Sequence, residues 1–193
     1  MLFYDKTNSG AVIDAETNKP IEGAIVVGMW RLSQFPGEGF GGYAKVTLVT
    51  TDKDGRFAIP WWVRFKPWKF YMYLTDLAPE IYIYKPGYKF HSSHKKSRLG
   101  YSSAYEMSAE ERRKLYDKHA INPARLVRIY SDQDRLDNYE MIEMKTEFPS
   151  NLYSSDELIL FAKSQKEELI KLSDNNNRKI TLLSNIEELL SKR

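Results

Sequence analysis

The chain has 193 residues, of which 42% are hydrophobic and 13% aromatic, so it can bury a sizeable core and falls outside the disordered class. Its formal net charge is only +3, and its acidic and basic residues are interleaved, so composition gives no reason to expect a nucleic-acid partner. The absence of cysteine excludes disulfide bonds, thiol catalysis and cysteine-ligated zinc.

The first half of the chain is typical of short strands separated by turns. Residues 9–14 predict a short strand, and Pro20 interrupts pairing in the turn that follows, because proline has no N–H to donate. Residues 24–32 predict the clearest strand, with apolar side chains on both of its faces. Such a strand is expected in the middle of the fold, buried between two layers.

Two blocks within the first 62 residues each join two β-branched runs through a turn, which predicts two hairpins. The first block pairs residues 9–14 with 24–30, and the second pairs residues 43–51 with 56–62. The Asp-Lys-Asp-Gly turn of the second block predicts a positive φ at Gly55. It lacks the remaining ligands of an EF-hand, so we expect no calcium site there.

An ordered set of motifs covers roughly the first 90 residues. The motifs are Gly10-x-Val12-x-Asp14, Thr17, Lys19-Pro20-Ile21, Gly23-Ala24-x-Val26, Thr51-Asp52-x-Asp54-Gly55-x-Phe57-x-Ile59-Pro60 and Pro86-Gly87-Tyr88. In combination they resemble the carboxypeptidase regulatory-like domain family. The resemblance implies a transthyretin-like (prealbumin-like) fold, a seven-stranded antiparallel Greek-key β-sandwich, with Tyr88 packed over the sandwich edge.

The expected fold class is therefore mainly β with an α appendage. We expect the sandwich over residues 1–131, with a last strand at 124–130 and a polar insertion at 89–124 that contains a helix beginning near Ser108. Residues 132–193 are expected to form a linker and then a C-terminal helical hairpin. Its apolar residues recur at helical spacing on both sides of an Asn-rich break, and we expect both helices to pack on the sandwich.

Residues 61–74 combine tryptophan, phenylalanine and tyrosine with basic side chains. Either the C-terminal helices cover these rings, or the rings form a binding surface. The glycine-rich loop at 35–43 is the second candidate surface, and it lacks the Lys-Ser or Lys-Thr pair of a phosphate-binding loop. The candidate partner-binding residues are Trp61, Trp62, Arg64, Lys66, Trp68, Tyr71, Tyr73, Phe35, Phe40 and Tyr43.

We expect no catalytic residue, no metal and no cofactor. His91 and His94 have a spacing that zinc could use, but a third ligand would have to come from His119 or a carboxylate, so surface histidines are favoured. The motifs of zinc peptidases, and of the hydrolases and dioxygenases found on transthyretin-like folds, do not occur in the chain.

The sequence thus predicts a non-enzymatic, envelope-associated module that binds or braces another protein, with an inhibitor or immunity protein as a special case. The alternative is a carbohydrate-binding module that uses the rings at 61–73. The resemblance implies a bacterial protein of the periplasm or cell envelope, for which any membrane attachment would be through a lipid anchor that is removed or absent in this chain. No signal segment is visible in this chain, and a cytoplasmic location stays open, as do the partner's identity and the oligomeric state.

Overall fold

The computed structural model describes residues 2–34, 40–65, 72–74, 79–92, 123–145, 156–172 and 177–191. The architecture is mixed α/β, with strands in the N-terminal part and three helices in the described C-terminal part. The strands are β1 (Leu2–Asp5), β2 (Asn8–Asp14), β3 (Ile25–Gln34), β4 (Phe40–Thr50), β5 (Arg56–Ile59), β6 (Trp62–Phe65), β7 (Met72–Leu74), β8 (Glu80–Tyr84), β9 (His91–Ser92) and β10 (Ala124–Leu126). The helices are α3 (Asp132–Lys145), α4 (Asp156–Lys171) and α5 (Asn177–Ser191).

The described strands form three sheets. The largest has the order β4-β3-β8-β9 with β7 also paired to β3, the second has the order β10-β2-β5, and the third pairs β1 with β6. Pairing among the described strands is antiparallel except between β10 and β2, which run parallel. The expected number of seven strands is therefore wrong, because proline interrupts the ladders and short edge segments such as β9 add strands.

The two expected hairpins do not form. Strand β2 pairs with β5, and β3 pairs with β4, so each strand finds its partner in the other sequence block. Among the described residues β2 is not paired with β3, and the isolated bridge of Ile13 is to Pro20 in the turn that follows β2. At the turn after β4 the chain passes from the large sheet to the three-stranded sheet β10-β2-β5, so β4 and β5 belong to different sheets and are not partners.

The turn between β4 and β5 nevertheless has the expected backbone, with Gly55 at φ +69°. Its carbonyl accepts a hydrogen bond from the N–H of Val12 at 2.8 Å. A Cβ at position 55 would stand 2.5 Å from the carbonyl oxygen of Val12. Glycine is required here both for its left-handed backbone and for the close approach of this turn to β2.

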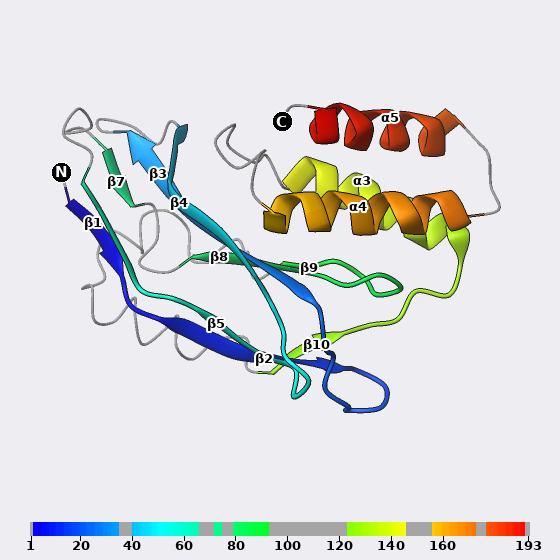
Figure 1. The fold of residues 1–193 in the computed structure, drawn as a ribbon, viewed down its shortest axis with the longest axis horizontal. Coiled ribbons are helices and arrows are strands. Elements are labelled where there is room, and N and C mark those ends of the chain that lie inside the picture. The colour runs from blue at the N-terminus through cyan, green and yellow to red at the C-terminus, as the bar shows by residue number, and fades with distance from the viewer. Residues whose placement is uncertain are drawn as a thin grey trace, which may run out of the picture.

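Strand β3 lies between the helices and the strands β2 and β5 (Figure 1). As predicted, its apolar side chains are buried on both faces. One face joins the strand-side core, which consists of Phe3, Val12, Ile21, Ala24, Val26, Trp30, Leu32, Ala44, Phe57, Ile59, Trp62, Ile81, Ile83, Ala124 and Leu126. The other face joins the helix-side core, which consists of Ile25, Val27, Met29, Val46, Leu48, Tyr82, Tyr84, Phe90, Leu136, Tyr139, Ile142, Leu158, Phe161, Ala162, Leu169, Leu172, Leu182 and Ile186. The large sheet is thus the middle of three layers.

Helix α3 occupies a segment that was expected to be a linker. Ser131 caps it, because its Oγ accepts a hydrogen bond from the N–H of Asp134 at 3.0 Å. Leu136, Tyr139 and Ile142 form a buried stripe on one side of the helix. The stripe is narrow and is interrupted by the buried polar side chain of Asn138, so the apolar periodicity of this helix is weak in the sequence.

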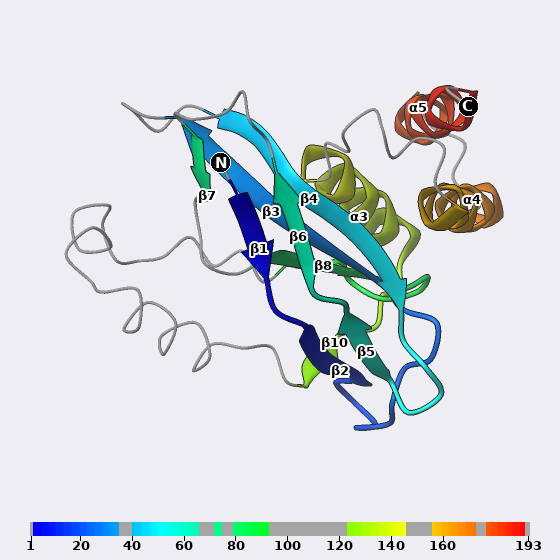
Figure 2. The ribbon, with the colours of Figure 1, turned by 60° about the vertical axis from the view of Figure 1, so that its left-hand side comes forward.

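The C-terminal helical hairpin is confirmed as α4 and α5, which contribute apolar side chains to the helix-side core. Figure 2 shows the helices on one side of β3 and β4, with β1 and β6 on the opposite side. The helices therefore do not cover β6, which holds the described start of the aromatic stretch. The expected helix near Ser108 lies outside the described residues, and the expected domain boundaries remain a prediction.

One carboxylate helps to hold the helices on the sheet. Glu168 of α4 accepts hydrogen bonds from the hydroxyls of Tyr139 at 2.5 Å and Tyr84 at 3.3 Å. Its second oxygen accepts the backbone N–H of Gly87 at 2.7 Å. Burial raises the pKa of both tyrosines, so their hydroxyls stay protonated and available as donors. This contact joins α3, α4 and the turn after β8.

Candidate functional site

Strands β1 and β6 form a two-stranded ribbon that continues the β2–β5 ladder. Asp5 stands opposite Trp62 at the end of one ladder, and Asn8 stands opposite Ile59 at the start of the other. The step from one pair to the next is equally long on both strands, so the register is unchanged across the break. Pro60 stands at the break, where it lacks the N–H that a continuous ladder would use. The ribbon is thus held at one end by β2–β5.

The inner face of the ribbon belongs to the strand-side core. Phe3 and Trp62 are both buried there. The ring of Trp62 meets that of Trp30 edge-to-face at 5.2 Å, and Trp30 Nε1 donates a hydrogen bond of 2.8 Å to Oδ2 of Asp5. These contacts fix which side of the ribbon faces the large sheet.

The outer face of the ribbon carries large apolar side chains that remain accessible. Across the ribbon Leu2 stands opposite Phe65, and Tyr4 stands opposite Val63. These residues and the neighbouring Trp61 define the outer ribbon face, with exposed fractions of 57% (Leu2), 71% (Tyr4), 68% (Trp61), 54% (Val63) and 67% (Phe65). Single exposed apolar residues are common on soluble proteins, but a group of five on paired strands is typical of an interaction surface.

The ribbon and its immediate neighbours carry more basic than acidic side chains, and the basic ones are the more exposed. Lys6 and Arg64 are both exposed, but Arg64 alternates with Val63 and Phe65, so it leaves β6 on the side away from the outer ribbon face and donates a hydrogen bond to the carbonyl oxygen of Ala44 at 3.2 Å. The only acidic residue of the two strands, Asp5, is partly buried and accepts the indole N–H of Trp30. The ribbon therefore offers an apolar face with a basic rim.

The β2–β5 end of the ladder presents a different surface. Its outward positions carry Ser9, Ala11, Arg56 and Ala58, which are small or polar. These positions alternate with the core residues of the same two strands, and with the register unchanged it is those core positions that continue the outer ribbon face. The face of the ladder that enters the core therefore changes between its two ends, and the exposed apolar side chains are confined to the ribbon.

The structure separates the residues that the sequence grouped as a partner-binding site. Trp61 and Arg64 are exposed on the ribbon, whereas Trp62 is buried and its ring is unavailable to a partner. The positions of Lys66, Trp68, Tyr71 and Phe35 lie outside the described residues, and for Tyr73 only its backbone pairing with Ser33 is described.

The second candidate surface lies elsewhere. Phe40 begins β4 and is 46% exposed, and its ring meets that of the partly buried Tyr43 at 5.2 Å. The guanidinium of Arg31 lies 5.0 Å from the centre of the Phe40 ring. These contacts occupy much of both rings, so this pair is a weaker candidate than the ribbon.

The sequence did not single out Leu2, Tyr4, Val63 or Phe65 as site residues. The alternation of the ribbon was visible in β6, where Trp62 and Arg64 alternate with Val63 and Phe65. Nothing in the sequence of either strand indicated which face would meet the core. The pairing of β1 with β6 supplies that information.

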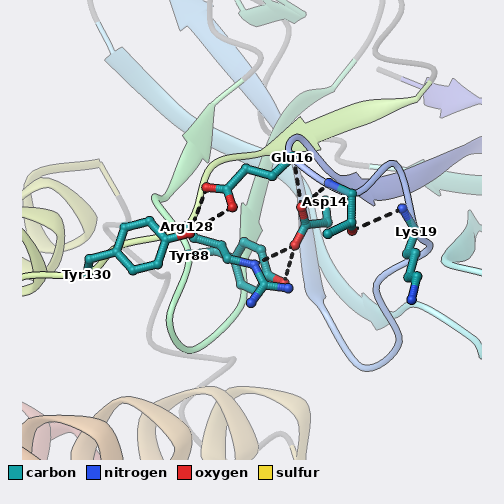
Figure 3. Close-up of polar contacts among 7 residues, drawn as sticks. Asp14, Glu16, Lys19, Tyr88, Arg128 and Tyr130 are labelled. Atoms are coloured by element: carbon teal, nitrogen blue, oxygen red, sulfur yellow. Dashed lines mark hydrogen bonds and ion pairs between the residues drawn. The ribbon is translucent and has the colours of Figure 1, made fainter.

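A second candidate site surrounds Asp14, at the end of β2 (Figure 3). Its Oδ1 accepts the backbone N–H groups of Glu16 and Thr17, at 2.8 and 2.9 Å. Its Oδ2 accepts the hydroxyl of Tyr88 at 2.9 Å and Nε of Arg128 at 2.7 Å. The Thr17 N–H, with the Arg128 guanidinium and the other donors, holds the pKa of Asp14 well below its usual range.

An open depression of about 320 Å³ lies beside Asp14. It is lined by Asp14, Thr17, Lys19, Pro20, Ile21, Glu22, Lys85, Tyr88 and Arg128. Both carboxylate oxygens of Asp14 are occupied by donors of the chain itself, and a carboxylate whose pKa is held well below its usual range is a poor general acid or base near neutral pH. The arrangement ties β2 to the segment that leads into α3.

Several residues of the family-like motifs meet in such structural contacts. Asp14, Thr17 and Tyr88 share the network just described. Thr51 Oγ1 accepts the N–H of Ala24 at 2.8 Å and donates to the carbonyl oxygen of Ile21 at 2.7 Å. The spacing of these motifs is thus explained by hydrogen bonds that close the turns, without any reaction chemistry.

Among the described residues, no group of three His, Asp or Glu side chains is arranged to hold a metal ion. His91 lies in β9, where burial lowers its pKa, and His94 and His119 lie outside the described residues. None of the described helices is both long enough and apolar enough to cross a membrane.

Comparisons with protein-family models, with curated proteins and with solved structures each return no match for this chain.

Proposed function

We propose that this chain is a non-enzymatic binding module that holds another protein on the outer ribbon face. The observation that carries the proposal is a group of five apolar side chains, each more than half exposed, of which four lie on one face of the paired β1–β6 ribbon and the fifth, Trp61, directly precedes β6. Aromatic residues and arginine are enriched in protein interfaces, and exposed apolar patches of this kind mark them.

The composition of the face favours a protein partner over a carbohydrate. Sugars stack on flat exposed rings, and Tyr4, Trp61 and Phe65 could supply them. Leu2 and Val63 stand between those rings, and aliphatic side chains suit a close-packed protein contact better.

For the fold, we propose the transthyretin-like sandwich that the motif resemblance implies. Support comes from the strand-side core, where the large sheet faces β2, β5 and β10. The parallel pairing of β10 with β2 is a departure from an all-antiparallel sandwich. We also propose a location in the cell envelope, with the resemblance as its only support.

A photo-crosslinking experiment tests the proposed function. Benzoylphenylalanine placed at position 65 should yield covalent adducts with another protein in cells of the native host. Ile180 of α5 is the matched control, since it is 54% exposed on a different layer. The adducts should disappear when excess purified chain is added, and persist when the competitor carries Tyr4→Glu and Phe65→Glu.

Two results would reject the proposed function. One is an equal set of adducts from positions 65 and 180, which would mean that the ribbon has no special affinity. The other is retarded migration in polysaccharide gels that Trp61→Ala and Phe65→Ala abolish, with no protein adduct at position 65, which would favour the carbohydrate alternative.

A further inference from the structure

We infer that a second copy of this chain binds the outer ribbon face, so that the protein forms a two-fold symmetric dimer through β1 and β6. The inference rests on the proposed function, because it names the partner of the same surface. Three observations support it: the arrangement of side chains on the face, its area, and the position of its charges.

The four central side chains alternate in size across the ribbon. The pairs Leu2 with Phe65 and Tyr4 with Val63 place the two aromatic rings on one diagonal of the face. The two aliphatic side chains occupy the other diagonal. A face with this pattern presents two protrusions and two lower positions.

Such a pattern is complementary to itself. When two sheet faces pack with their strands aligned, a two-fold axis between them and along the strands turns one face over onto the other. The aromatic diagonal of each copy then lies over the aliphatic diagonal of its partner. Tyr4 of one copy meets Val63 of the second, and Phe65 meets Leu2, so large side chains fill the spaces above small ones.

The area of the face is appropriate for a dimer. At exposed fractions of 54–71%, the five side chains present on the order of 600 Å² of surface. A stable interface buries about 800 Å² per partner, and the polar rim supplies the rest. Closed two-fold dimers are also the commonest assemblies of soluble proteins.

The charges lie where a dimer tolerates them. Lys6 follows the end of β1, and Arg64 directs its guanidinium to the carbonyl oxygen of Ala44, so neither charge covers the four central side chains. Two basic rims repel each other, and salt screens that repulsion. A second copy therefore binds more tightly as salt rises, whereas an acidic protein or an anionic membrane would bind more weakly.

Sedimentation velocity of the full chain, from low micromolar to several hundred micromolar, tests the inference. The expected result is a concentration-dependent shift to twice the 22.6 kDa mass of the chain, strengthened by added sodium chloride. The variants Tyr4→Glu/Phe65→Glu and Tyr4→Lys/Phe65→Lys should each sediment as monomers. Ile180→Glu, the matched control on α5, should dimerise like the unmodified chain.

Mixing the two ribbon variants is the decisive arm. The acidic-faced and basic-faced chains should form a mixed dimer at low salt, which a misfolded variant could not do. A chain that stays monomeric at every concentration would overturn the inference, as would dimers that survive in both ribbon variants. Co-sedimentation of a monomeric chain with phosphatidylglycerol vesicles, lost in the acidic-faced variant, would assign the face to a membrane instead.

The two proposals can fail separately. A monomeric chain with specific protein adducts at position 65 leaves the proposed function standing and removes the second copy. A dimer whose adducts at position 65 contain only this chain supports both proposals, because the second copy is then the protein that the outer ribbon face holds.

Discussion

Of two apolar surfaces of this protein, one is covered by helices and the other is exposed. One face of the large sheet is covered by α3, α4 and α5, which the same chain supplies. The β1–β6 ribbon lies on the side of the large sheet opposite to the helices (Figure 2). The large side chains of the outer ribbon face are more than half exposed. Helices tethered to a sheet cover it at little entropic cost, while a face without a tethered cover must gain its contacts from another molecule.

The largest expected effect on stability comes from removing a buried side chain from the helix-side core. Phe161→Ala removes a ring that is 2% exposed and meets Tyr84 edge-to-face at 5.1 Å, so it should lower the free energy of unfolding by about 3–5 kcal/mol. Phe65→Ala, on the exposed face, should change it by no more than about 0.5 kcal/mol. Urea denaturation followed by circular dichroism measures both. Similar losses for the two variants would contradict the assignment of covered and uncovered surfaces.

A smaller loss of stability is expected from the contact between β2 and the segment that leads into α3. Asp14→Asn removes the ion pair with Arg128, and the loss of thermal stability should fall between those of Phe161→Ala and Glu168→Gln. Its pH dependence identifies the cause. The pKa of Asp14 is lowered on folding, so its contribution is complete above the pKa of about 3.9 in the unfolded chain and is lost as pH falls further.

Thermal unfolding of the parent chain and of Asp14→Asn between pH 7 and pH 2 tests that sign. The difference between them should be constant near neutral pH and should shrink in acid. A difference that grows in acid would show that the ionised carboxylate does not act as described.

Glu168→Gln tests the polar contact beneath the helices. The amide keeps the shape of the side chain, but only one of its two terminal atoms can accept a hydrogen bond. It therefore cannot accept both the tyrosine hydroxyls and the N–H of Gly87, and we expect the free energy of unfolding to fall by about 1–3 kcal/mol. Amide hydrogen exchange should rise in α4 and α5 before it rises in β3. Uniform exchange across helices and sheet would mean that the contact is not specific to helix attachment.

The smallest effect separates two tryptophans beneath the ribbon. Trp30→Phe loses the hydrogen bond to Asp5, whereas the buried Nε1 of Trp62 meets no acceptor among the described residues. Trp62→Phe should therefore be less destabilising than Trp30→Phe by about 1 kcal/mol in urea denaturation. An equal cost would indicate that ring volume alone decides stability at both positions.

The sequence was sufficient for features that depend on one segment. The burial of β3 on both faces follows from its continuous apolar composition, and the left-handed turn at Gly55 follows from its Asp-Gly pair. The C-terminal hairpin follows from two long periodic stripes. Each of these three features depends on residues that are neighbours in the sequence.

Features that depend on distant partners could not be obtained in this way. The pairing of β2 with β5 is decided by the whole strand-side core, while local turn chemistry favoured hairpins. In the ribbon, Trp61 and Trp62 are adjacent and equally apolar, so alternation predicts opposite faces without saying which is inside. Contact with Trp30 decides it.

The parallel pairing of β10 with β2 has a consequence for the integrity of the chain. Ala124 and Leu126 lie in the strand-side core, and α3, α4 and α5 contribute to the helix-side core, so the described elements after residue 123 pack against strands that come before residue 92. A single proteolytic cut between residues 92 and 123 would therefore leave two fragments that share both cores.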